Sequence, residues 1–277
     1  MHVYVVLLFV ALVSFNRVSS VLPQNGGFPE HLNYTITFRD GLFGRDAFHT
    51  MGLAWDGCHY ISVSGGNTDG NRLAFYSKNG TLMQLYSPGL DFRSIFTTAT
   101  RHHRHSHVMV RLFGNNTLLR MREPDLFKLS VTLNTSLDSQ SHVVPSACYG
   151  TYMALMFGGR VDFWNRQGEW LNSIMLQDYG QVLGENQYPA YTNIVAFEHQ
   201  LITLANSEAS VWNCNGTRIA RVRLDDVEGT YDIYWSLSVA NGLLWLVDEQ
   251  SRMFRGYQFY QQEKATNDGM SCNGSDF

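Results

Sequence analysis

Histidines are concentrated in one short segment of the chain, Arg101 to His107. If this segment is extended, His103, His105 and His107 project to one side, and imidazole groups so arranged can bind Zn²⁺ or Cu²⁺. A solvated polar loop between two strands fits the same residues. The segment therefore predicts either a metal site or a loop that becomes cationic below about pH 6.5.

Two aspartates are the acidic residues most suited to the interior of the fold, because each precedes the first strand of a repeated unit. They are Asp46 and Asp232. Two carboxylates at a suitable separation can act as acid and as nucleophile or base in glycoside hydrolysis. Aspartates at such positions also accept hydrogen bonds from turn amides. Both interpretations stay open, so these residues do not decide between an enzyme and a binding protein.

Common catalytic motifs are missing from the sequence. It contains no Gly-x-Ser-x-Gly elbow, phosphate-binding loop, His-Glu-x-x-His or Cys-x-x-Cys. We therefore predict no cofactor. The formal net charge of -4, with 16% charged residues, gives no reason to expect a nucleic-acid partner.

The N-terminus has the layout of a secretory signal peptide over residues 1–20. An apolar stretch from Val3 to Val13 is followed by the small-residue site Val18-Ser-Ser20. The stretch is too short to span a bilayer comfortably, and no later run approaches the required twenty apolar residues. We expect a secreted, extracellular protein without stable membrane insertion.

Sequons and cysteines fit this secretory route. Six Asn-x-Ser/Thr sequons predict N-glycosylation at Asn33, Asn79, Asn115, Asn134, Asn215 and Asn273. The four cysteines are Cys58, Cys148, Cys214 and Cys272. They permit three pairings in an oxidising compartment, and their spacing does not choose among them. A bridge at Cys272 would fix the C-terminus, whereas Cys148 is expected in an apolar strand, where it can be merely buried.

The elements that must position these groups are strands, because hydrophobic periodicity is two almost everywhere. The clearest unit contains four short strands between Met51 and Leu85, with hairpin turns at Asp56-Gly57 and Asn79-Gly80. Corresponding positions recur about every 43 to 49 residues, the period of a propeller blade.

Five copies of the unit predict an all-β fold, a β-propeller of about five four-stranded blades. The fifth copy lacks an outer strand, and the strand-like segment Leu32 to Phe38 is unassigned. We expect this N-terminal strand to complete the fifth blade and close the ring. The propeller domain then covers residues 21–262, followed by a polar tail at 263–277.

The sequons suggest which face of the propeller binds a ligand. The second copy is assigned to Ile95–Thr100, His107–Phe113 and Asn115–Arg120. Asn115 then lies on a hairpin between third and fourth strands, as Asn79 and Asn215 do in their own blades. Glycans would crowd that face, and the opposite face is the predicted binding surface. The segment Glu123 to Val143 is expected there as a long loop.

Two short patterns resemble known propeller families. Gly52-Leu-Ala-Trp-Asp-Gly57, followed by the hairpin Asn79-Gly-Thr-Leu82, resembles the blades of secreted propellers of the NHL and YVTN type, over most of the mature chain. Asp46-Ala-Phe-His-Thr-Met-Gly-Leu53 is similar to the first blade of the five-bladed plant-type glutaminyl cyclases. That segment is short, and no catalytic residue is transferred from the family.

These observations together favour a secreted propeller that acts as a binding or interaction module for an extracellular protein or glycan ligand. The alternatives are an extracellular enzyme with carboxylates at the central channel, either a glycan hydrolase or a glutaminyl cyclotransferase-like protein, and a lectin-like sugar binder. Tryptophans recur at strand positions, where packing between blades is expected rather than stacking on sugars: Trp55, Trp164, Trp170, Trp212, Trp235 and Trp245.

Overall fold

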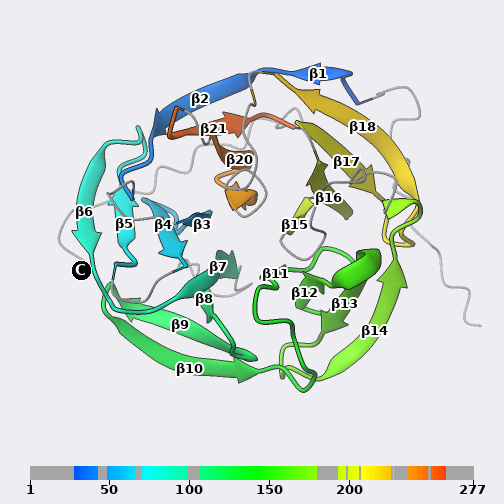
Figure 1. Cartoon of the computed structure of the whole chain (residues 1–277), viewed down its shortest axis with the longest axis horizontal. Helices are drawn as coiled ribbons and strands as arrows, with labels where there is room; N and C mark the ends of the chain where they lie inside the picture. The colour runs from blue at the N-terminus through cyan, green and yellow to red at the C-terminus, as the bar shows by residue number, and fades with distance from the viewer. Residues whose placement is uncertain are drawn as a thin grey trace, which may run out of the picture.

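A computed structural model shows five β-sheets arranged as blades around a central axis (Figure 1). It describes residues 28–42, 49–66, 70–98, 107–179, 193–197, 199–205, 207–225, 227, 236–248 and 251–259. The predicted five-bladed β-propeller is confirmed. Within these residues, no helix has the length and apolar character needed to cross a membrane. The predicted signal peptide and the polar tail lie outside them.

Each blade contains four antiparallel strands, ordered from the innermost at the axis to the outermost at the rim. Blade 1 is β3 (His49–Trp55), β4 (Tyr60–Gly65), β5 (Leu73–Tyr76) and β6 (Leu82–Tyr86). Blade 2 is β7 (Phe92–Thr98), β8 (His107–Leu112), β9 (Thr117–Glu123) and β10 (Leu126–Thr132). Blade 3 is β11 (Val143–Pro145), β12 (Tyr152–Leu155), β13 (Arg160–Trp164) and β14 (Trp170–Met175). Blade 4 is β15 (Ile194–Phe197), β16 (Gln200–Ala205), β17 (Glu208–Trp212) and β18 (Arg218–Leu224). Blade 5 is β19 (Ser238–Ala240), β20 (Leu243–Asp248), β21 (Met253–Tyr257) and β2 (Tyr34–Arg39).

The N-terminal strand closes the ring, as predicted. β2 pairs antiparallel with β21, with Phe38 opposite Phe254. The short strand β1 (His31–Leu32) pairs in parallel with β18 of blade 4, so the segment bridges two blades (Figure 1). At the other end of β2, the Asp40 carboxylate accepts hydrogen bonds from the Thr50 hydroxyl and the Leu42 N–H, at 2.5 and 3.0 Å. The segment from β1 to Asp40 is therefore bound to three blades.

Each of the five blade interfaces has its own apolar core. Trp164 lies between blades 2 and 3, Trp212 between blades 3 and 4, and Trp245 between blades 5 and 1. All three indoles are fully buried, and each N–H donates a hydrogen bond. The prediction of packing tryptophans is confirmed for these three and wrong for Trp170, which is about half exposed on an outer strand.

Glycines in the outer hairpins allow neighbouring blades to meet. Gly168 and Gly216 have φ of +88° and +80°, and their carbonyls accept hydrogen bonds from Asn134 N–H and Gln177 N–H of the preceding blade, at 2.9 and 2.8 Å. A Cβ on Gly168 would lie 2.1 Å from the Thr132 carbonyl oxygen. Only glycine fits both the left-handed backbone and this close approach.

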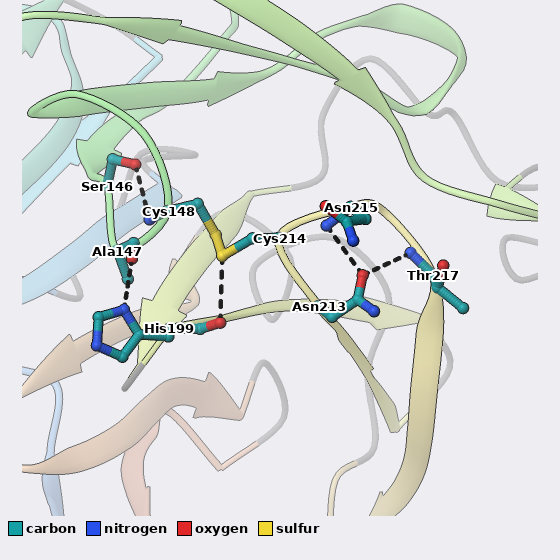
Figure 2. Close-up of a disulfide and its surroundings, with 8 residues drawn as sticks. All are labelled: Ser146, Ala147, Cys148, His199, Asn213, Cys214, Asn215 and Thr217. Carbon is teal, nitrogen blue, oxygen red and sulfur yellow. Dashed lines mark hydrogen bonds between the residues drawn. A yellow bond between two sulfur atoms is a disulfide. The ribbon is translucent and has the colours of Figure 1, made fainter. Parts of the chain in front are cut away.

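A disulfide joins blades 3 and 4. Cys148 lies in the hairpin between β11 and β12, and Cys214 lies in the hairpin between β17 and β18 (Figure 2). The Cys214 sulfur lies 3.3 Å from the His199 backbone carbonyl oxygen, and the His199 ring Nδ1 lies 3.0 Å from the Ala147 carbonyl oxygen (Figure 2). The expectation that Cys148 lies in an apolar strand is therefore wrong. Cys58 is also disulfide-bonded, and its partner lies outside the described residues.

We expect Gly168→Ala to destabilise the protein more than Gly114→Ala. Gly114 also has a left-handed φ, +69°, but an added Cβ there would meet no atom within 4 Å. Strain alone should cost Gly114→Ala about 1 kcal/mol of unfolding free energy, whereas Gly168→Ala must also separate two blades and should cost about 3 kcal/mol. Urea unfolding measures both. Equal losses would show that the blades do not approach so closely in solution.

Replacing both Cys148 and Cys214 with serine should lower the unfolding free energy by about 2–4 kcal/mol, because the bridge closes a chain segment of 66 residues in the unfolded state. The measurement is thermal unfolding of the variant beside the oxidised wild type. A wild type whose melting temperature matches that of the double variant would contradict a bridge between these hairpins.

Candidate functional site

The two faces of the disc differ in the segments they carry. Hairpins joining first to second and third to fourth strands lie on one side, which we call the hairpin face. Loops joining second to third strands and the connections between blades lie on the other, the loop face. Asn79 and Asn215 lie in hairpins between third and fourth strands, on the hairpin face, as predicted. Both are exposed.

The prediction for Asn115 is wrong. It lies in the loop between β8 and β9, on the loop face, because the hairpin between third and fourth strands of blade 2 is at Pro124-Asp125. Residues of the expected long loop from Glu123 to Val143 form β10, the outer strand of this blade. The loop face therefore also carries a sequon, at Asn115.

An axial cavity of about 170 Å³ is enclosed by the innermost strands of the blades. Most of the side chains that line it are apolar, and the described residues that line it include no carboxylate: Met51, Ile95, Phe96, Thr97, Val144, Pro145, Asn193, Val195, Ala196, Leu237, Ser238 and Val239. Polar and apolar atoms contribute nearly equally to the surface of the cavity.

The polar side chains in this cavity already hold blades together. Asn193 donates to the Leu237 carbonyl of blade 5 at 2.7 Å and accepts from the Ile194 N–H at 2.8 Å. The Ser238 hydroxyl accepts from the Leu53 N–H of blade 1 at 3.0 Å and donates to a backbone carbonyl of its own blade. These groups therefore act as structural links around the axis.

The predicted catalytic and metal residues are mostly not placed. Asp46, Asp232, His103 and His105 lie outside the described residues. His107 is the first residue of β8 and half-buried. Over the part of the chain that the structure covers, no three His, Cys, Asp or Glu side chains are grouped to hold a metal ion. Both the metal site and the catalytic aspartates stay predictions.

An exposed phenylalanine on the loop face is held by a buried ion pair. Arg93 on β7 bonds to the Asp91 carboxylate at 2.5 and 3.2 Å, and Asp91 also accepts the Gly66 N–H at 2.9 Å. The guanidinium carbon of Arg93 lies 4.6 Å from the centre of the Phe113 ring. This cation–π contact fixes a ring that is 45% exposed, in the loop between β8 and β9.

A second buried arginine fixes the connection between blades 2 and 3. Arg111 donates to the backbone carbonyls of Asn115, Asp138, Ser139 and Ser141. Burial, and then the neighbouring positive charge of Arg93, lower the pKa of Arg111 to about 10, so the side chain stays charged at neutral pH. The guanidinium shapes the loop-face segment that leads into β11.

His142 lies at the end of that segment and is buried. Its Nδ1 has no hydrogen-bond partner among the described residues. Burial, and then the positive charges of Arg111 and Arg93, lower its pKa to about 3, so the ring is neutral at physiological pH. Proton binding here would place a third positive charge in the same buried cluster.

Phe157 is the most exposed large apolar side chain described, at 79% exposure. It begins the 3₁₀ turn η1 (Phe157–Gly159) between β12 and β13, on the loop face. The turn is well held, because Gly159 N–H donates to Met156 and Leu176 N–H donates to Gly159, at 3.3 and 2.9 Å. Phe157 and Phe113 thus occupy equivalent loops of adjacent blades.

Sequence reasoning missed both phenylalanines. Each follows a strand-like apolar run, so period-two patterns extend the strand through it. The only sequence indication is the glycine that follows each one, Gly114 and Gly158, since glycine favours a turn. Whether each phenylalanine is exposed depends on where its strand ends, and the period-two hydrophobic pattern does not determine that position.

Comparisons with known proteins give no family and only distant structural neighbours. No protein-family model and no curated protein matches the chain. Among solved structures, it is similar to a protein of unknown function from Bacteroides caccae, at 11% identity and TM-score 0.43, over 74% of this chain and 72% of that chain. It is similar to BamB from Moraxella catarrhalis, at 16% identity and TM-score 0.37, over 77% and 60%. The β-propeller domain of Cps50 (Swd1) from Myceliophteria thermophila gives 13% identity and TM-score 0.38, over 76% and 83%. At such identities and TM-scores, these similarities assign no role to the chain.

We expect acid to destabilise the protein through His142. Because the folded-state pKa of about 3 lies below the ordinary value of 6.5, the contribution of neutral His142 is complete above pH 6.5 and is lost as the pH falls toward 3. The stability difference between wild type and His142→Asn should change by about 1.4 kcal/mol per pH unit in that window. Urea unfolding at pH 7.5, 6 and 5 measures it. A constant difference would contradict burial of a neutral imidazole.

Proposed function

We propose that the protein is a secreted, glycosylated β-propeller with NHL- or YVTN-like blades that acts as an extracellular binding module for a protein ligand. The fold supports this function, because five packed interfaces hold the loops of the ring in fixed positions. The disulfide between Cys148 and Cys214 supports an oxidising compartment.

The observation that carries the proposal is the exposure of Phe157 on a rigid turn of the loop face. Exposed aromatic side chains are costly in water and are common anchors in the centres of protein interfaces. Arg160, which directly follows the turn, is half exposed and pairs with the buried Asp162 at 2.9 Å, so it places one polar group beside this surface. Phe113 occupies the equivalent loop of the adjacent blade, which also carries the Asn115 sequon.

The lectin and enzyme alternatives have less support. Repeated sugar sites would need similar loops in several blades, yet the loops between second and third strands range from the two residues 206–207 to the seven residues 66–72. An enzyme would need converging catalytic groups, and the described lining of the axial cavity contains no carboxylate. Its candidates, Asp46 and Asp232, lie outside the described residues.

The proposal is tested by substitution of Phe157 with serine. Wild-type protein, Phe157→Ser and the control Leu129→Ser are immobilised and used to capture partners from extracellular fluid, and the identified partner is then titrated against each. Leu129 is 59% exposed on β10 at the rim, so its loss controls for removal of an apolar surface group. We expect Phe157→Ser to weaken affinity at least tenfold. Equal affinities of the two variants would contradict binding at the loop face.

A further inference from the structure

The outer strand of every blade is an edge, with backbone groups that a strand of another molecule can pair with. Three outer strands carry protection against such pairing. β18 contains three arginines and is partly covered by β1, β10 contains Lys128, and β2 contains Arg39. β6 and β14 contain no charged residue.

These two uncharged edges also expose apolar side chains. Six of these side chains are 43–57% exposed: Leu82, Met83, Leu85, Trp170, Leu171 and Met175. Antiparallel pairing of β6 with the same strand of a second copy, centred on Gln84, would place Met83 opposite Leu85 without any like-charge repulsion. Both strands are thus suited to self-association if nothing covers them.

Three sequons lie at the ends of these same two strands. Asn79 is exposed in the hairpin that leads directly into β6. The Asn134 side-chain oxygen accepts the N–H of Trp170, the first residue of β14, at 2.8 Å. At the far end of β14, the hairpin that carries Asn215 packs closely against Met175. A Cβ added to Gly216 of that hairpin would lie 2.1 Å from the Met175 carbonyl oxygen.

We propose that N-linked glycans on Asn79, Asn134 and Asn215 cover the apolar edges β6 and β14 and prevent pairing with a second copy of the chain. A glycan is bulky and hydrated, so its attachment at the end of a short strand excludes an incoming strand. This inference rests on the proposed function only in requiring a secretory route, and it does not depend on binding at Phe157.

The test compares the triple variant Asn79→Gln, Asn134→Gln, Asn215→Gln with wild type and with Asn115→Gln, all made as full chains in glycosylating cells. Glycopeptide mass spectrometry measures occupancy, and size-exclusion chromatography with light scattering measures mass. We expect the triple variant to form dimers or larger species at concentrations where the other two proteins are monomeric. Asn115 lies in the loop between β8 and β9 of blade 2, the blade whose outer strand β10 carries Lys128, so it controls for the loss of a glycan.

A second pair of substitutions identifies the surface. Adding Met83→Lys and Leu171→Lys to the triple variant should restore the monomer, because charge on an edge strand opposes pairing. If the triple variant is not secreted, enzymatic deglycosylation of folded wild type gives the same readout.

Three results would overturn the inference. They are wild-type asparagines without glycans, a deglycosylated protein that stays monomeric, and association that the lysines do not reverse. None of these experiments involves the loop-face partner. The effect of Phe157→Ser on affinity therefore tests the proposed function independently of this inference.

Discussion

The antiparallel pairing of β2 with β21 is the interaction on which the rest of the structure depends. Without it, blade 5 would have three strands and the interface between blades 5 and 1 would lack Phe38, whose ring lies 5.0 Å from the rings of both Tyr76 and Phe254. Closure joins chain segments more than two hundred residues apart. A ring joined in this way has no terminal blade that must expose an apolar face.

Closure also explains why the axis and the loop face are suited to binding. Each blade packs against two neighbours, so its middle strands are buried on both faces, as in β4 and β5. Asn193 and Ser238 link blades around the axis, while Arg93 and Arg111 fix segments of the loop face. Such a frame presents Phe157 and its surroundings with little conformational entropy to lose on association.

The sequence was sufficient for the fold and insufficient for the site, for physical reasons. Blade count and closure follow from periodic strands and from turns such as Asn79-Gly80, which are local features. The strand order predicted for blade 2 is wrong because Asn115-Asn116 is as good a turn as Pro124-Asp125. Only the pairing of β9 with both β8 and β10 shows which of the two turns joins the third and fourth strands. The partnership of Cys148 with Cys214 depends on adjacency of two blades, and exposure of Phe157 depends on where a strand ends.

Hydrogen exchange of the β2 amides tests the closed ring most directly. The amides of residues 36–39 that pair with β21 should exchange as slowly as those of β20 and β21, because all three strands then open only in a shared unfolding event. β2 amides that exchange orders of magnitude faster than those of β21 would contradict closure by the N-terminal strand, and with it the rigid ring that supports the loop face.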